Sequence, residues 1–367
     1  MTNEPTDQLH REMLRLTLIP DVGPVLYDAL IEHFGGAEEA LAAPAGELEQ
    51  VPGMGRKRTR AFLKARGGVD VDAELEAVRA AGVRLVARDD EEYPEALKYL
   101  TGPPPILYVR GRLEKTDGLA IAIVGSRRCS LYGRDQAERF ATALARAGFT
   151  IVSGLARGID SCAHNGALKV GGRTVAVLGN GLSNIYPPEN KALAEAVCAS
   201  GAVISEFPMA TAPKAGNFPQ RNRLLSGLSL GVLVIEAAER SGALITARLA
   251  AEQGKEVFAL PGRVDSPYSA GVHRLIKTGA KLVHGLEDVL DEFPELRPDG
   301  TFETGAEEQE PAGLAASLSP EEHRLLGHLT KEPVPLDQLA TASGMPPQTI
   351  SGTLTLLELK GLVRSIA

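Results

Sequence analysis

Aromatic residues are scarce in this 367-residue sequence: they make up 4% of it, and tryptophan is absent. A protein that holds a polynucleotide chiefly by stacking its bases needs exposed aromatic rings, and only Phe218 and Tyr132 are near candidates for that role. Apolar runs of the ~20 residues that cross a bilayer are absent too, and the polar N-terminus does not resemble a signal peptide. We therefore expect no membrane partner.

Cysteine is also rare. Cys129, Cys162 and Cys198 form no close pair and no metal-ligand spacing, whereas disulfide frameworks and zinc sites show characteristic cysteine spacings. This usage predicts a reducing, cytoplasmic location and no metal site.

Motifs of nucleotide-dependent enzymes are missing as well. The apolar run 120–124 is followed by Gly125-Ser-Arg-Arg128 without a G-x-G-x-x-G fingerprint, and no P-loop occurs. Gly227-Leu-Ser-Leu-Gly231 matches the hydrolase string G-x-S-x-G but precedes a strand, whereas a nucleophile elbow follows one; Ser229 is interpreted as a chance match. His164 has no evident partner and is interpreted as structural. The sequence therefore predicts no catalytic residue, no cofactor and no enzyme activity.

What the chain does contain is a series of short, nearly continuous apolar runs separated by helical segments. Such runs are typical of parallel strands covered on both faces. They predict an α/β fold with an extended Rossmann-like parallel sheet. The expected strands are residues 120–124, 149–153, 174–178, 202–205, 231–235 and 255–259.

Glycine-rich turns that carry arginine follow the first two of these strands, and a further basic segment precedes the fifth. In an open parallel sheet such turns meet at the carboxyl ends of the strands, where ligands bind. Backbone N–H groups and arginine side chains both bind phosphate. The candidate residues are Gly125, Ser126, Arg127, Gly154, Arg157, Gly158, Lys214, Asn217, Phe218, Arg221, Asn222 and Arg223.

Arg127 and Lys214 are the strongest candidates for phosphate contact within this set. Arg221 and Arg223 have an alternative role, because each could brace its loop by pairing with Glu206 or Glu236. The formal net charge of −8 does not argue against a polyanionic ligand, since basic side chains outnumber acidic ones within residues 118–294.

The remaining segments suggest further domains. Residues 1–66 are predicted to form a helical helix-hairpin-helix or SAM-like domain. Its turn at residues 51–55 leads into Arg56-Lys-Arg58, interpreted as an accessory DNA-binding cluster or, alternatively, as the solvated face of a protein-interaction module. The core domain is expected at residues 67–294, and residues 295–316 form an acidic linker.

Residues 317–367 are predicted to form a winged-helix-like domain. Ser319-Pro-Glu-Glu322 is typical of a helix start, and Gly361-Leu-Val-Arg364 indicates a strand. The expected recognition helix 348–360 carries only Lys360 as a basic residue, whereas DNA-reading helices bring phosphate-neutralising charge. A protein-contact or regulatory role is therefore favoured over DNA readout.

At these motifs the chain resembles the DNA-processing protein A (DprA/Smf) family. The resemblance is strong over about residues 85–294, and the flanking helical segments agree with the family's architecture. The segments that carry it are Ile123-Val-Gly-Ser-Arg127, Ser153-Gly-Leu-Ala-Arg-Gly-Ile-Asp160, Val177-Leu-Gly-Asn-Gly-Leu182, Tyr186-Pro-Pro-Glu-Asn190, Phe218-Pro-Gln-Arg-Asn-Arg223 and Glu236-Ala-Ala-Glu-Arg-Ser-Gly242.

The resemblance implies a single-stranded DNA-binding protein that does not cut its ligand. It implies that the protein protects incoming DNA and loads the RecA recombinase in natural transformation and homologous recombination. It also implies a homodimer whose interface includes Leu275 and Ile276, with Arg127 and Lys214 as the family's DNA-binding arginine and lysine. The sequence departs from the family pattern at His273, where asparagine is usual, and at Ser183, where aspartate is usual.

The main alternative is a Rossmann-like nucleotide-binding enzyme of the phosphoribohydrolase type. Such enzymes carry a Pro-Gly-Gly-x-Gly-Thr-x-x-Glu segment, and the comparable place here, residues 239–246, lacks it. A nucleotide-sensing scaffold is a third interpretation. Both are less favoured than single-stranded DNA binding.

Overall fold

The computed structural model describes residues 4–294, 319–329, 334–359 and 363. The chain forms two compact units, Met1–Arg297 and Pro298–Ala367, which are described separately below. The acidic linker predicted at residues 295–316 and, apart from Val363, the strand predicted at residues 361–364 lie outside the described residues.

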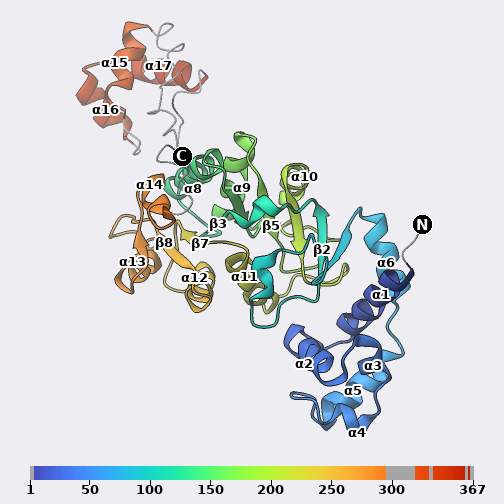
Figure 1. Cartoon of the computed structure of the whole chain (residues 1–367). Coiled ribbons are helices and arrows are strands. Elements are labelled where there is room, and N and C mark those ends of the chain that lie inside the picture. Colours follow the sequence, from blue (N-terminus) through green and yellow to red (C-terminus); the bar gives the residue numbers. More distant parts are fainter. Residues whose placement is uncertain (1–3, 295–318, 330–333, 360–362, 364–367) are drawn as a thin grey trace. The chain divides into compact units, whose positions relative to one another are not determined.

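The first unit is built around a nine-stranded sheet with the order β1-β2-β6-β5-β4-β3-β7-β8-β9 (Figure 1). The strands from β6 to β9 are parallel, and β1 and β2 extend the sheet in antiparallel pairing. The bounds are β1 Arg84–Ala87, β2 Ile106–Gly111, β3 Ala120–Val124, β4 Thr150–Ser153, β5 Thr174–Val177, β6 Ala202–Ser205, β7 Gly231–Val234, β8 Glu256–Ala259 and β9 Lys281–Leu282.

This sheet confirms the predicted α/β class. The strands predicted at 120–124 and 202–205 have the same bounds in the structure, and the other four end within a residue of the prediction. Every residue of β3 is buried, because a central parallel strand is covered by helices on both faces. Strand β9 was not predicted, because it has only two residues, Lys281 and Leu282, and contains no run of apolar residues.

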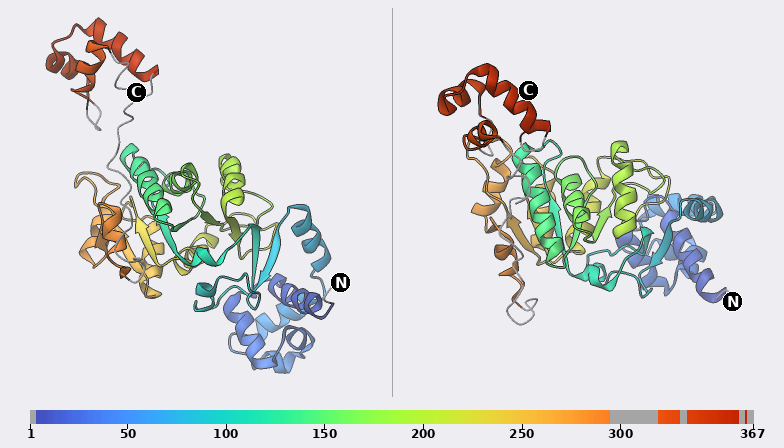
Figure 2. Two further views of the ribbon diagram at one scale, coloured as in Figure 1. Left: turned by 45° about the horizontal axis from the view of Figure 1, so that its top comes forward. Right: turned by 90° about the horizontal axis from the view of Figure 1, so that it is seen from above.

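Helices cover both faces of the sheet. On one face α8, α9 and α10 lie side by side, and on the other α11 packs against α12 (Figures 1 and 2). The reason is the handedness of strand–helix–strand connections: the chain runs outward from β3 to β6 and then in the opposite direction from β7, so the later helices lie on the opposite face. The bounds are α8 Leu131–Arg146, α9 Ile159–Lys169, α10 Lys191–Ser200, α11 Asn217–Gly227, α12 Ala243–Glu252, α13 Ala270–Lys277 and α14 Leu286–Leu290.

This change of direction makes the β3–β7 boundary a topological switch point. In open α/β sheets, ligands bind in the crevice outside the carboxyl ends of the strands at such a point. We call the side of the sheet where the parallel strands end the carboxyl edge, and the opposite side the amino edge.

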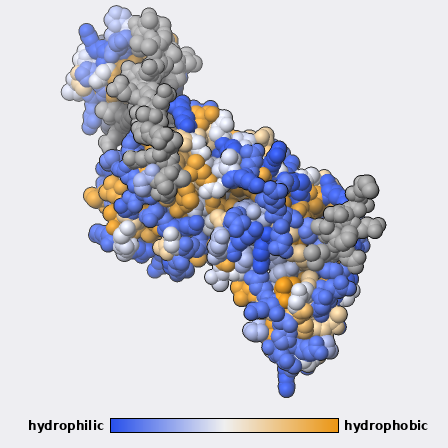
Figure 3. Space-filling model, viewed as in Figure 1, coloured by the Kyte–Doolittle hydropathy of each residue, from blue (hydrophilic) through white to orange (hydrophobic). Residues whose placement is uncertain are grey.

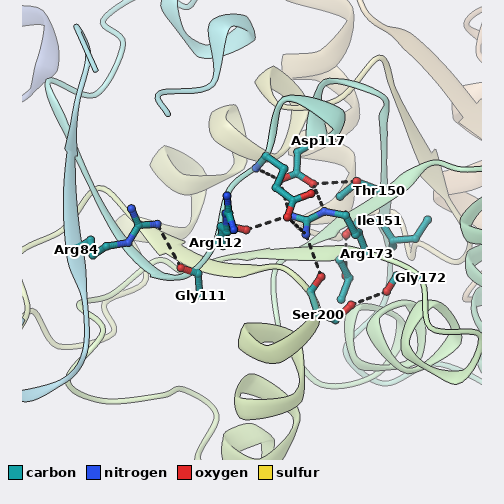
Figure 4. Close-up of polar contacts among 11 residues, drawn as sticks. Arg84, Gly111, Arg112, Asp117, Thr150, Ile151, Gly172, Arg173 and Ser200 are labelled. Atoms are coloured by element: carbon teal, nitrogen blue, oxygen red, sulfur yellow. Dashed lines mark hydrogen bonds and ion pairs between the residues drawn. The ribbon is translucent and has the colours of Figure 1, made fainter. Parts of the chain in front are cut away.

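The amino edge is held together by a polar network around Asp117 and Arg173 (Figure 4). Arg173 donates to both carboxylate oxygens of Asp117 at 2.9 Å, and Thr150 donates to the same carboxylate at 3.0 Å. Arg173 also donates to the carbonyl oxygens of Arg112 and Ser200. Since Asp117, Thr150 and Arg173 precede or begin the parallel strands β3, β4 and β5, the network ties the starts of these strands together.

The N-terminal residues form helices that precede the sheet, as predicted. Apolar residues of these helices, among them Leu14, Leu30 and Phe62, share one core with sheet residues such as Tyr108 of β2. The helical region is therefore packed against the sheet. The turn predicted at 51–55 ends at Gly55, the N-cap residue of the next helix, and a similar turn at 19–23 ends at the N-cap residue Gly23. The bounds are α1 Glu4–Leu18, α2 Pro24–Phe34, α3 Ala37–Ala42, α4 Ala45–Leu48, α5 Arg56–Arg66, α6 Val71–Ala80 and α7 Glu95–Lys98.

The second unit contains α15 (Pro320–Leu326), α16 (Leu336–Ser343) and α17 (Pro347–Leu359). Ser319 and Glu322 form the predicted capping box at the start of α15. A small apolar core, which includes Leu325 and Ile350, joins the helices.

Candidate nucleic-acid interface

A cavity of about 490 Å³ opens at the switch point on the carboxyl edge. It is bounded by the turn after β3, the first half of α11, the start of α9 and the loop between β7 and α12. The predicted residues Gly125, Ser126, Arg127, Phe218, Arg221 and Asn222 all line it.

Two of the predicted glycines are required by close packing of the turns. Gly158 has a φ of +77°, and a Cβ there would lie 2.3 Å from the carbonyl oxygen of Ser126. A Cβ on Gly154 would lie 1.8 Å from Nη1 of Arg221. The first position needs the left-handed region that favours glycine and lets two turns approach each other closely. The second leaves room for the Arg221 side chain of α11.

Arg127 and Lys214 are exposed, and neither forms an ion pair with another residue of the described part of the chain. The Arg127 guanidinium lies over the ring of Phe218, 4.8 Å from its centroid, at a distance typical of a cation–π contact. Asn217 and Phe218 begin α11, three and four residues after Lys214. The structure therefore brings the β3 turn and the start of α11 together, with cationic groups that face solvent.

Arg157 is placed differently. It is 54% exposed, but its Nε donates to the carboxylate of Glu189 in a short contact. This hydrogen bond raises the pKa of Arg157 further and lowers that of Glu189. A phosphate at Arg157 would have to compete with the carboxylate.

Arg221 and Arg223 both have internal partners, but only Arg223 has one of the acids that the bracing alternative named. Arg223 pairs with Glu206, one of the two acids named for that role. Arg221 is 4% exposed and donates to the carbonyl oxygen of Val177 at 2.6 Å. Burial lowers the pKa of Arg221 to about 10, against the opposing effect of Asp160. Asn222 is also buried.

Two acids outside the predicted set of binding residues organise these turns, and one of them, Glu236, holds Ser130 instead of an arginine. Asp160 accepts hydrogen bonds from the backbone N–H groups of Gly154 and Ala156. Glu236 accepts from the backbone N–H and the hydroxyl of Ser130, at the start of α8. Asp160 stands in the first turn of the helix after Gly154, which is a usable signal; the Glu236 contact joins residues 106 positions apart and has no local signal.

The residues rejected as catalytic have structural roles. Ser229 is buried, and its hydroxyl donates to the carbonyl oxygen of Leu225. His164 is buried, its Nδ1 lies 2.7 Å from the Thr174 hydroxyl, and burial lowers its pKa to about 3. Within the described ranges, no cluster of three or more His, Cys, Asp or Glu side chains could hold a metal ion. No described helix has the length and apolar character needed to cross a membrane.

The accessory cluster lies at the start of α5. Arg58 donates to the carbonyl oxygen of Gly53 at 2.7 Å, which braces the preceding turn. Arg56 is 89% exposed and lies 3.7 Å from Glu49, and Lys57 is exposed. Arg56 and Lys57 are therefore accessible to a ligand, whereas Arg58 supports the turn.

The residues predicted for a dimer interface lie on α13. Leu275 and Ile276 are half-buried against the core that α12 and the sheet share. Leu275 also lines an open groove of about 860 Å³ between α12 and α13. Nε2 of His273, where the chain departs from the family pattern, lies 3.0 Å from the carbonyl oxygen of Gly262.

In the face shown in Figure 3, hydrophobic residues are scattered among hydrophilic ones.

The fold and the site define a Rossmann-like protein with a cation-rimmed cavity at its switch point, preceded by a helical hairpin domain. Residues 84–294 match the family described as DNA recombination-mediator protein A. Residues 7–77 match the DprA-like N-terminal HHH domain, and residues 309–367 match the DprA winged helix domain. The chain belongs to the DNA-processing protein A (DprA/Smf) family, as its motifs predicted.

Similar proteins agree over most of the chain. It is 37% identical to Protein Smf of Synechocystis over 94% of each chain. It is 44% identical to Protein Smf of Escherichia coli over 77% of this chain and 75% of that protein.

Solved structures lead to the same family. The crystal structure of DNA processing protein A from Streptococcus pneumoniae has a TM-score of 0.66 and 33% identity, and the match covers 80% of this chain and 98% of that one. A structure of the Helicobacter pylori protein, described as showing its single-stranded DNA binding mode, has a TM-score of 0.52 and 30% identity. That match covers 59% of this chain and 98% of the other.

Proposed function

We propose that this protein binds single-stranded DNA at the carboxyl edge of its sheet and leaves the strand uncut. The observation that carries the proposal is the pair of exposed cations, Arg127 and Lys214, which have no ion-pair partner in the described part of the chain and lie on segments at the switch-point cavity. The DNA-binding mode named for the Helicobacter pylori relative supports it.

Backbone contacts would dominate this binding. Arg127 and Lys214 would each bind a phosphate, and the glycine turns at Gly125 and Gly154 would let the backbone approach. Phe218, already under Arg127, is available for a base. Since phosphate contacts carry no sequence information, binding should tolerate any sequence and weaken steeply with salt.

The remaining predicted residues have graded roles. We propose that Ser126, Gly158 and Asn217 shape the backbone around the phosphates. Arg221, Asn222 and Arg223 would act mainly by holding α11 in place, because they are buried or internally paired. Arg157 would contribute weakly, because Glu189 already neutralises it.

In the cell, we propose that the protein protects incoming DNA during natural transformation and homologous recombination and loads the RecA recombinase onto it. The match to a family described as recombination-mediator supports this role. A homodimer through Leu275 and Ile276 would present two cavities to one strand. A cytoplasmic location, and accessory DNA contacts by Arg56 and Lys57 with Arg58 as a brace, belong to the same proposal.

Fluorescence anisotropy with a labelled oligothymidylate tests the site. Arg127→Ala and Lys214→Ala should each weaken binding. Lys169→Ala should not, because Lys169 is an exposed lysine of α9 that is paired with Glu138 of α8. An adenosine monophosphate hydrolysis assay on the same samples should show no turnover. Unchanged binding in both variants would refute the site, and hydrolysis would favour the phosphoribohydrolase alternative.

A further inference from the structure

A second, smaller pocket lies between the helical region and the central sheet. It is bounded by the turn between α1 and α2, the start of β2, the segment after β6 and the first turn of α11. Its volume is about 120 Å³, which is enough for about four water molecules at ~30 Å³ each, or for a small group of similar volume. The described residues that line it are all different from those that line the cavity at the switch point, so the two sites are separate.

The carboxylate of Glu206 is the charged group of this pocket. Of the described residues that line the pocket, Glu206 is the one with a charged side chain, and that side chain is 7% exposed. Its Oε2 accepts a hydrogen bond from Arg223, but its Oε1 is buried and has no hydrogen-bond partner among the described residues. Since buried polar atoms are nearly always satisfied in folded proteins, a hydrogen-bond donor on a ligand fits here.

The walls of the pocket suit a flat cation. Tyr27, Tyr108 and Phe207 line it together with four prolines. Aromatic faces attract cations, and a planar guanidinium stacks on such rings while it donates hydrogen bonds to a carboxylate. The N-terminus of α2 also borders the pocket, but it offers little to an anion there, because its first residue is Pro24, which has no N–H group to donate.

We propose that this pocket binds a guanidinium group, which comes from an arginine side chain of another protein or from a free alkylguanidine. The group consists of one carbon and three nitrogens, so its size agrees with the volume of the pocket. One N–H donates to Oε1 of Glu206, and the plane of the cation lies against the aromatic rings. Gly23 and Gln220 line the pocket and are exposed, so the alkyl chain leaves the pocket beside them.

Gly23 offers a way to close the pocket without straining the backbone. It lines the pocket, and a Cβ at this position meets no atom within 4 Å. Its φ of −86° and ψ of 173° suit any residue that precedes a proline. Gly55 is the matched control, because it is the exposed N-cap residue of α5, with an extended backbone and open space at its Cβ, but is not among the residues that line the pocket.

Isothermal titration calorimetry compares agmatine with N-carbamoylputrescine, in which a neutral urea replaces the guanidinium. The titrations are done at pH 8, because burial raises the pKa of Glu206 to about 7 and the carboxylate is then mostly ionised. Wild-type protein should bind agmatine at millimolar concentrations and the urea about tenfold more weakly. Glu206→Gln should weaken agmatine binding about tenfold, in line with the loss of one hydrogen bond to a charged group. Gly23→Leu should abolish it and Gly55→Leu should not change it. Thermal unfolding shows whether each variant is folded.

A short peptide with a central arginine separates the two sources of the guanidinium. If the peptide binds as tightly as agmatine or more tightly, the occupant is a protein side chain, and if only agmatine binds, it is a free alkylguanidine. Three results overturn the inference: neither compound binds, so that water fills the pocket; the urea binds as well as agmatine, so that charge plays no part; or Glu206→Gln and Gly23→Leu both bind like the wild type, so that the site lies elsewhere. No DNA is present, so failure of the proposed function would not change these results.

Discussion

The two edges of the central sheet use the same residue types for opposite purposes. At the amino edge, Arg173 is bound to Asp117 and to backbone carbonyls (Figure 4), so its charge is used within the fold. At the carboxyl edge, Arg127 faces solvent over Phe218 without an ion pair among the described residues. The difference shows that an arginine stays accessible to a ligand where the fold leaves it without an acid.

The largest expected effect comes from breaking the amino-edge network. Asp117→Ala removes the carboxylate that Arg173 and Thr150 share, and it leaves Arg173 with Glu114 as an acidic partner at 3.2 Å. We expect the free energy of unfolding in urea to fall by about 3 kcal/mol, at the lower end of the range for a broken buried pair, because Arg173 is 25% exposed and keeps Glu114.

DNA binding by folded Asp117→Ala protein should be unchanged, since the network lies at the other edge of the sheet. Lys115→Ala is the control, because its partner Glu91 is fully on the surface, and it should not change stability measurably. A stable Asp117→Ala variant would contradict the structural role of this edge.

At the carboxyl edge the side chain of Glu206 is buried, and its titration should make the stability of the protein depend on pH. Burial raises the pKa of Glu206 from 4.5 to about 7, although Arg223 acts in the opposite direction. Because the folded-state pKa is the higher one, this group contributes most stability below pH 4.5, and the contribution is lost as the pH rises through about 7. Between about pH 5 and 8, wild-type stability should fall relative to Glu206→Gln by about 3 kcal/mol.

Urea unfolding of both proteins across this pH range measures the difference. Glu195→Gln is the control, since Glu195 is 49% exposed and pairs with Arg110 on the surface, and its curve should follow that of the wild type. Parallel curves for wild type and Glu206→Gln would show that the carboxylate is ionised throughout and stabilised by Arg223.

The third prediction concerns Arg127, which has no ion-pair partner among the described residues. Arg127→Ala should weaken oligonucleotide binding by about 1.5–3 kcal/mol, the range for a hydrogen bond to a charged group, with little change in stability because the side chain is exposed. The slope of log affinity against log salt should decrease by about 0.7, the value for one phosphate contact on a single strand. A large loss of stability would instead make Arg127 a structural residue like Arg173.

The smallest expected effect on DNA binding is that of Arg157, which is paired with Glu189 at the carboxyl edge, whereas Arg127 is not paired among the described residues. Arg157→Ala should weaken binding by no more than about twofold, since Glu189 already holds the guanidinium. Glu189→Ala frees Arg157 and should strengthen binding by a similar factor. Anisotropy at low salt measures both, and a loss for Arg157→Ala as large as for Arg127→Ala would show that the ion pair opens when DNA binds.

Most of the fold could be predicted from local sequence. The apolar runs 120–124 and 202–205 coincide with β3 and β6, because a strand buried on both faces requires an unbroken run of apolar residues. Ser319 and Glu322 predicted the start of α15, because a capping box depends on residues that are only three positions apart. The glycine turns and Arg127 were likewise readable next to the strand they follow.

The sequence by itself determined the strands, the turns that contain glycine and arginine, and the family. Only the tertiary structure decided which of the arginines are free, because their partners are brought in from distant parts of the chain: Glu206 lies 17 residues from Arg223 and Glu189 lies 32 residues from Arg157. The cavity is likewise a tertiary feature, since its walls come from β3, α11 and α12, which meet only when the chain reverses direction at the switch point.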